Sequence, residues 1–114
     1  MTDDRVRRRL EDLARFVDEA AYVVSKGRDA YLAATPEGAL LRHAGERILI
    51  KIATVAEKLP EDFRAHHPTI DWAGLMRLNR LTARLDDRGS EDLTWRALSV
   101  RVPGLPSALG RQIA

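Results

Sequence analysis

The sequence predicts an all-α protein, and three observations carry that prediction. Apolar residues recur every three or four positions over two long stretches, which is the period of an amphipathic helix. Residue types that begin and end helices flank these stretches, and no alternation of apolar and polar residues predicts a strand. At 114 residues the chain supports one core. We therefore expect a single domain over residues 1–114, built as a four-helix bundle with short additional helices.

The composition narrows the class of protein. Charged residues make up 32% of the chain and Gly and Pro are few, which is typical of a globular protein. The chain has no cysteine, which excludes disulfides and thiolate metal sites. No segment reaches the roughly 18 apolar residues of a membrane span, and the N-terminus lacks the apolar run of a signal peptide. We therefore expect a cytoplasmic protein without a membrane partner. The net charge of +2 is too small to predict a nucleic-acid partner by itself.

The first helix is predicted to begin at Thr2 and to end at Ser25. Thr2 is the expected N-cap, with Asp3 and Asp4 in the first turn, where the helix dipole favours negative charge. Apolar residues then keep a helical period: Val6, Leu10, Leu13, Val17, Ala20 (or Ala21) and Val24. Gly27 ends this helix, and residues 28–33 are expected to form one or two turns that place Tyr31 over the end of the core.

A second long helix is predicted from Thr35, as N-cap, to Pro60. Pro36 suits its first helical position. Its apolar residues are Leu41, Ala44, Ile48, Ile52, Val55 and Leu59, and Leu40, Leu49 and Ile50 broaden the arc. A broad arc indicates more than one neighbour, a second subunit among them. Residues 60–68 are expected to hold at most a short turn.

A third helix is predicted from near Asp71 to about Asp86, and the rest of the chain is organised around it. Its leucines lie on one side: Leu75, Leu78, Leu81 and Leu85. Its arginines form a second stripe within about 60° of arc at 100° per residue: Arg77, Arg80, Arg84 and Arg88. A row of guanidinium groups suits a polyanion or an acidic partner, and a solvated helix face is the alternative.

A fourth helix is predicted after Ser90, its expected N-cap, with Leu93, Ala97 (or Leu98) and Val100 on its apolar side. Prolines and a glycine, Pro103, Gly104 and Pro106, are expected to interrupt it. Residues 107–113 are expected to form a last short helix.

Residues with catalytic side chains are few. The histidines are His43, on the predicted second helix, and His66 with His67 in a loop. A His-His pair can bind a metal ion, but no Asp, Glu or third histidine lies at ligand spacing from this pair on a shared helix. We therefore expect no metal site and no cofactor. The chain has no glycine-rich phosphate loop and no nucleophile elbow. The larger aromatic residues are expected in the core or at its edge: Tyr22, Tyr31, Trp72 and Trp95.

The order of these landmarks resembles the HepT-like branch of the HEPN (higher eukaryotes and prokaryotes nucleotide-binding) proteins. Four segments carry the resemblance over nearly the whole chain: LEDLARFVDEAAYVV, LLRHAGERILIKIATVAEKLP, HPTIDWAGL and LTWRALSVRVPGL. Members of that family are small all-α, usually dimeric ribonuclease toxins that are encoded beside a minimal nucleotidyltransferase (MNT) antitoxin. The resemblance therefore implies a four-helix bundle of HEPN type, a homodimer, an MNT-type nucleotidyltransferase partner and RNA as a ligand.

The family's catalytic motif, Arg-Asn, a short spacer and His-x-Tyr, is degraded in this chain. Counted from Trp72 without gaps, Asn79 and Arg80 stand at the Arg and Asn positions. Arg84 then stands at the His position and Asp86 at the Tyr position. A longer spacer, as in the wider superfamily, would instead pair Arg77 with Arg84. Thr54 stands where the family usually has a Glu on its second helix. No histidine follows His67, so no register restores the motif histidine.

These substitutions bear directly on the chemistry. Metal-independent RNA cleavage needs a group that transfers a proton and a cation that stabilises the phosphorane charge. Arginine stays protonated, so Arg84 is expected to bind phosphate without replacing the histidine, and Asp86 is the remaining group for proton transfer. The missing Tyr is the residue that the antitoxin modifies with AMP in the family.

Three interpretations stay open. The chain is a weakly active or inactive HepT-like toxin component that acts through dimer, partner and RNA binding. Alternatively, it is an active ribonuclease with a divergent site built from Arg77, Arg80, Arg84 and Asp86. The third interpretation is an unrelated helical interaction module.

Overall fold

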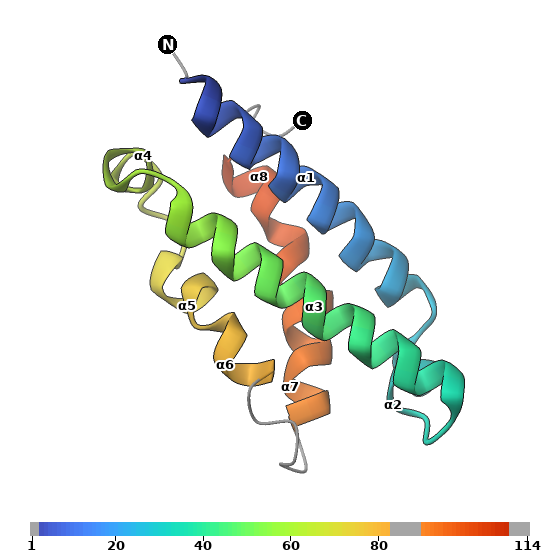
Figure 1. The fold of residues 1–114 in the computed structure, drawn as a ribbon. Coiled ribbons are helices and arrows are strands. Elements are labelled where there is room, and N and C mark those ends of the chain that lie inside the picture. Colours follow the sequence, from blue (N-terminus) through green and yellow to red (C-terminus); the bar gives the residue numbers. More distant parts are fainter. Residues whose placement is uncertain (1–2, 83–89, 110–114) are drawn as a thin grey trace.

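A computed structural model of the chain describes residues 3–82 and 90–109, and every regular element in these ranges is a helix. Two long helices, α1 (Asp4–Ser25) and α3 (Pro36–Lys58), run antiparallel side by side and are joined through the short helix α2 (Arg28–Leu32) (Figure 1). The remaining elements are α4 (Glu61–Ala65), α5 (Trp72–Met76), α6 (Leu78–Thr82), α7 (Ser90–Arg96), the π-helical turn η1 (Ala97–Arg101), the 3₁₀ turn η2 (Val102–Gly104) and α8 (Leu105–Leu109). The predicted all-α class is confirmed for the described residues.

α1 follows the prediction closely except at its first residue. Asp3 is the N-cap, because its carboxylate accepts a hydrogen bond from the Arg5 N–H at 2.7 Å; Thr2, the expected cap, lies outside the described residues. Both residue types supply the same acceptor to the free N–H groups of a first turn. The helix ends at Ser25 as predicted, and Gly27 turns the chain at a φ of 91°, which side chains other than glycine rarely adopt.

α3 is the helix around which the chain is arranged. Its N-terminus is capped as predicted, since the Thr35 hydroxyl accepts a hydrogen bond from the Gly38 N–H at 3.0 Å. α3 packs against α1, α2, α5, α6 and α7, so one chain covers most of its broad apolar arc, and Leu49 and Ile52 are fully buried. The prediction of several neighbours is confirmed. The breadth of the arc no longer requires a second subunit, although Leu40 remains 69% exposed.

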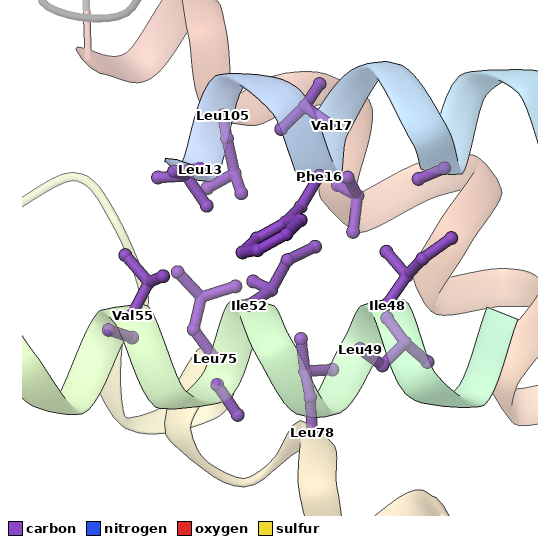
Figure 2. Close-up of a cluster of buried hydrophobic side chains, with 14 of the residues drawn as sticks. Leu13, Phe16, Val17, Ile48, Leu49, Ile52, Val55, Leu75, Leu78 and Leu105 are labelled. Atoms are coloured by element: carbon purple, nitrogen blue, oxygen red, sulfur yellow. The ribbon is translucent and has the colours of Figure 1, made fainter. Parts of the chain in front are cut away.

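The main core lies between α1 and α3. Figure 2 shows Phe16 of α1 above Ile52 of α3, and Leu78 on the side of α3 that faces α6. These three side chains are at least nine-tenths buried. α5 and α6 lie on the opposite side of α3 from α1 (Figure 1), so the two faces of α3 are covered by different parts of the chain.

The C-terminal run changes its helical type instead of breaking. α7 passes into η1, η2 and α8 without a loop. Pro103 is tolerated near the start of η2, and Pro106 is the second residue of α8, positions at which a helix needs no N–H donor. Two of the residues predicted to interrupt the helix, Pro103 and Gly104, lie in the 3₁₀ turn η2, but no loop separates η1 from α8, and the last helix begins at Leu105 instead of residue 107. Residues 110–113 lie outside the described part of the chain.

A buried polar junction joins α2, α3 and α7. Tyr31 is fully buried as predicted, and its Oη lies 2.8 Å from Thr94 Oγ1. Thr94 donates its own hydrogen to Glu91 O at 2.9 Å, so the Tyr31 hydroxyl is the donor of the first bond. A Cβ at Gly45 would lie 2.9 Å from Tyr31 Oη and 2.6 Å from Leu98 Cδ1. Only glycine leaves room for this contact between helices.

Arg42 completes the junction from α3. Its Nη1 donates to Tyr31 O and to Ala33 O, both at 2.8 Å, and its Nε lies 3.5 Å from a carboxylate oxygen of Glu91. The Arg42 side chain is only 15% exposed. It therefore satisfies the last carbonyl groups of α2, which a helix cannot satisfy internally.

Candidate anion-binding site

The α5–α6 segment carries the described part of the predicted arginine row, and two contacts fix its start. The Asp71 carboxylate accepts a hydrogen bond from the Gly74 N–H at 2.9 Å, as expected of an N-cap. The indole N–H of Trp72 lies 3.0 Å from Arg64 O and 3.1 Å from His67 O. Trp72 is half-buried at the edge of the core, and it ties α5 to the end of α4.

The predicted continuous helix from Asp71 to Asp86 is wrong, because the chain turns at Arg77 between α5 and α6. Arg77 has φ −84° and ψ −4°, and the Arg80 N–H donates to Arg77 O at 2.9 Å, a 3₁₀-type bond. In a 3₁₀ turn, residues three apart lie above one another. Leu75 and Leu78, which were predicted to share one side, are both buried, at 4% and 0% exposure. Local spacing alone does not reveal the turn at Arg77.

The arginine row is consequently not one stripe on a straight helix. Arg77, Asn79 and Arg80 are exposed. Within residues 3–82 and 90–109, neither Arg77 nor Arg80 forms an ion pair with an acid. The other predicted site residues, Arg84, Asp86 and Arg88, lie outside the described residues.

This segment offers cations without a described proton-transfer group. An exposed guanidinium donates several hydrogen bonds to phosphate or carboxylate oxygens and does not titrate. α5 and α6 contain no histidine. His43 lies on α3, His66 holds its Nδ1 2.6 Å from Asp62 O, and the ring of His67 lies 4.7 Å from that of Phe63. The described residues contain no group of three or more His, Asp or Glu placed to hold a metal ion.

Thr54, which stands at the position of the family's second-helix Glu, is exposed on α3. Its hydroxyl donates to Ile50 O at 3.0 Å, so its hydrogen is used within its own helix. Thr54 is neither acidic nor placed on α5 or α6, and it adds no proton-transfer group to the arginine segment.

The structure also reveals a surface that the sequence did not predict. Tyr22, expected in the core, is 63% exposed, and the ammonium group of Lys26 lies 4.6 Å from the centre of its ring. A signal existed, because Tyr22 continues the spacing of Glu11, Arg15 and Asp18 on the polar side of α1. Tyr22 lines a groove between α1 and α3 with a volume of about 520 Å³. Tyr31, Trp72 and Trp95 are in the core or at its edge as predicted.

Comparison of the chain with protein-family models, with curated proteins and with solved structures finds no match in any of the three. Over the described residues, no helix combines the length and the apolar character that crossing a membrane requires. The fold and the exposed arginines are thus the features of this protein that bear on its function.

Proposed function

We propose that this protein is a HepT-like member of the HEPN fold group, a four-helix bundle that forms a homodimer and binds RNA through Arg77 and Arg80 without cleaving it efficiently. One observation carries the proposal: both guanidinium groups are exposed and lack an acidic partner among the described residues. Leu75 and Leu78 are buried beside them, so the backbone that presents the arginines is anchored to α3. Arginines without an acidic partner on an anchored turn favour phosphate binding.

The same residues argue against efficient ribonuclease chemistry. No histidine follows His67, and an arginine at the motif position does not accept a proton from a 2′-hydroxyl near neutral pH. The Asp at position 86 replaces the tyrosine that the antitoxin modifies in the family. An MNT-type nucleotidyltransferase would therefore have to act on this protein by binding, without transferring AMP to that position.

RNA binding is tested with a fluorescent single-stranded RNA and fluorescence anisotropy at several salt concentrations. Arg77→Ala combined with Arg80→Ala is expected to weaken binding at least about tenfold, and the slope of log affinity against log salt falls by about 0.7 for each phosphate that the variant no longer binds. Arg8→Ala combined with Arg96→Ala is the matched control, because it removes the same charge at exposed positions on α1 and α7 that likewise form no ion pair among the described residues. Equal affinity of the two double variants would overturn RNA binding through the arginine turn.

Cleavage is measured on the same RNA without added metal. The unaltered protein is expected to cleave weakly or not at all, and Arg84→His combined with Asp86→Tyr is expected to increase cleavage, because it restores the family's residues. Strong cleavage by the unaltered protein that is abolished in the Arg77→Ala, Arg80→Ala variant would instead establish the divergent, arginine-based ribonuclease.

A further inference from the structure

The outer side of the α1–α3 pair carries an extended groove. Its larger part, of about 520 Å³, is lined by Tyr22 and Val23 of α1 and by Ala44 and Ile48 of α3. A second part, of about 420 Å³, continues from it along the same two helices. Both parts share Arg15, Glu19, Arg47 and Lys51 as lining residues. The groove therefore has apolar side chains between charged walls.

The two walls differ in charge. Among the lining residues, α3 contributes Arg47 and Lys51 and no acid. In the larger part, α1 contributes Asp18 and Glu19, whereas Arg15 is already paired with Asp12 at 3.1 Å and Arg9 lines the second part alone. Within the described part of the chain, none of Asp18, Glu19, Arg47 and Lys51 forms an ion pair. An acidic wall and a basic wall thus face solvent at the same level of the two helices.

Two large apolar side chains are exposed beside these charges. Tyr22 on α1 is 63% exposed, and Leu40 on α3 is 69% exposed. Leu40 precedes Ala44, Arg47 and Lys51 at spacings of four, three and four residues, which places it in the same stripe of the helix. Exposed large apolar groups next to charges without an ion-pair partner are typical of a protein–protein contact.

We propose that a second copy of this chain occupies the groove, related by a two-fold axis parallel to α1 and α3. A rotation about this axis does not change the position of any residue along the direction of the helices. It places α1 of one copy against α3 of the other. Because Asp18 and Glu19 line the same part of the groove as Arg47 and Lys51, each acidic wall then meets the partner's basic wall, twice in the dimer. This arrangement also brings Tyr22 of one copy toward the side of α3 in the other copy that contains Leu40 and Ala44.

Charge favours this occupant over a polyanion, since Asp18 and Glu19 of α1 would repel phosphates in the larger part of the groove. The inference rests on the homodimer proposed above and gives it an interface. This interface also determines where the arginines lie in the dimer, because α5 and α6 are on the opposite side of α3 from α1 (Figure 1). Each copy then presents its own Arg77 and Arg80, instead of sharing one arginine-lined cleft with its partner.

Two charge-reversal variants and their mixture test the interface. Arg47→Glu with Lys51→Glu gives a chain whose two walls are both acidic, and Asp18→Lys with Glu19→Lys gives one whose two walls are both basic. Each variant alone is expected to dimerise at least about tenfold more weakly than the unaltered protein, because like charges then face each other across the two-fold axis. Mixed in equal amounts, the two variants are expected to form a heterodimer, in which every acidic wall meets a basic one. Analytical ultracentrifugation at low salt measures all three samples, with circular dichroism as the check of folding.

Each outcome separates this interface from the rest of the proposed function. A monomeric unaltered protein would overturn both the homodimer and its interface. Dimers that persist in both reversal variants would overturn the interface and leave the homodimer standing. Loss of the dimer in Arg77→Glu with Arg80→Glu would place the interface on the α5–α6 segments instead. Loss of RNA binding in the Arg47→Glu, Lys51→Glu variant, with its oligomeric state unchanged, would identify the groove as an RNA site and overturn the inference.

Discussion

The junction of α2, α3 and α7 and the turn between α5 and α6 use arginine in opposite ways. At the junction, Arg42 is 15% exposed and bonds two backbone carbonyls and a carboxylate. At the turn, Arg77 and Arg80 are exposed and have no acidic partner in the described part of the chain. The first arginine stabilises the fold, whereas the other two add like charge to a surface. The contrast teaches that an arginine's role follows from its neighbours, because its charge is the same in both places.

The largest expected effect comes from filling the space at Gly45. Gly45→Val would push a side chain against Tyr31 and Leu98, where even a Cβ lies 2.9 Å and 2.6 Å from their nearest atoms. We expect a loss of about 3 kcal/mol in the free energy of unfolding, at the upper end for overpacked cores. Urea denaturation measures it. Gly104→Ala is the control, because a Cβ there has no neighbour within 4 Å. A similar loss of stability in both variants would mean that the close packing at Gly45 is not the cause of the loss.

Arg42→Ala is expected to cost about 2–3 kcal/mol, since it leaves two backbone carbonyls and the Glu91 carboxylate without their charged partner. Arg80→Ala is expected to change stability by less than about 0.5 kcal/mol. Thermal melts of both variants under one buffer give the comparison directly. If Arg80→Ala destabilised the protein as much as Arg42→Ala, the arginine turn would be structural and the proposed RNA site would be wrong.

Tyr31→Phe tests the hydroxyl of the junction alone and is expected to cost about 1 kcal/mol, the net value of one buried hydrogen bond. The loss stays small because Thr94 keeps its bond to Glu91 O at 2.9 Å. Tyr22→Phe, at an exposed ring, is the control and is expected to leave stability unchanged. An equal loss of stability in the two variants would mean that the buried hydrogen bond of Tyr31 does not stabilise the fold. Burial raises the pKa of the Tyr31 phenol above 10.0, against the opposing effect of its hydrogen bond with Thr94. The folded state therefore holds this proton more tightly, and stability falls as the pH rises through the raised pKa.

The smallest expected effect is a pH dependence from Glu46, beside the junction on α3. Burial, followed by the charge of Glu91, raises the pKa of this carboxyl above its ordinary 4.5, against the opposing charges of His43 and Arg42. The folded state therefore binds the proton more tightly, and stability falls as the pH rises through the raised pKa. Glu46→Gln is expected to be more stable than the unaltered protein at pH 7, with the difference disappearing below pH 4.5. Denaturation at several pH values measures it, and Glu57→Gln, an exposed position on α3, controls for the lost charge.

Features that depend on short stretches of sequence were predictable. The cap at Thr35 with Pro36 behind it, the end of α1 at Gly27 and the cap at Asp71 all agree with the structure. Each depends on a residue and the four or five that follow it, so local chemistry determines it. Arg77 and Arg80 were likewise expected to stay out of the core because an unpaired guanidinium group is costly to bury, and both are exposed.

Features that depend on where two helices meet were not predictable. The turn at Arg77 between α5 and α6, and the π turn of η1, which contains the buried Leu98, do not follow from the spacing of nearby residues. Small shifts in helical type cost little locally and are decided by the packing they permit.

The sequence by itself therefore determined that the described chain is helical, where the two long helices begin and end, and which side of α1 is apolar. Only the tertiary structure decided that α3 is the central helix and that acids of α1 and cations of α3 line one groove. Hydrogen bonds and caps act over one helical turn. The burial of a side chain, and the charge that faces it, depend on residues far away along the chain.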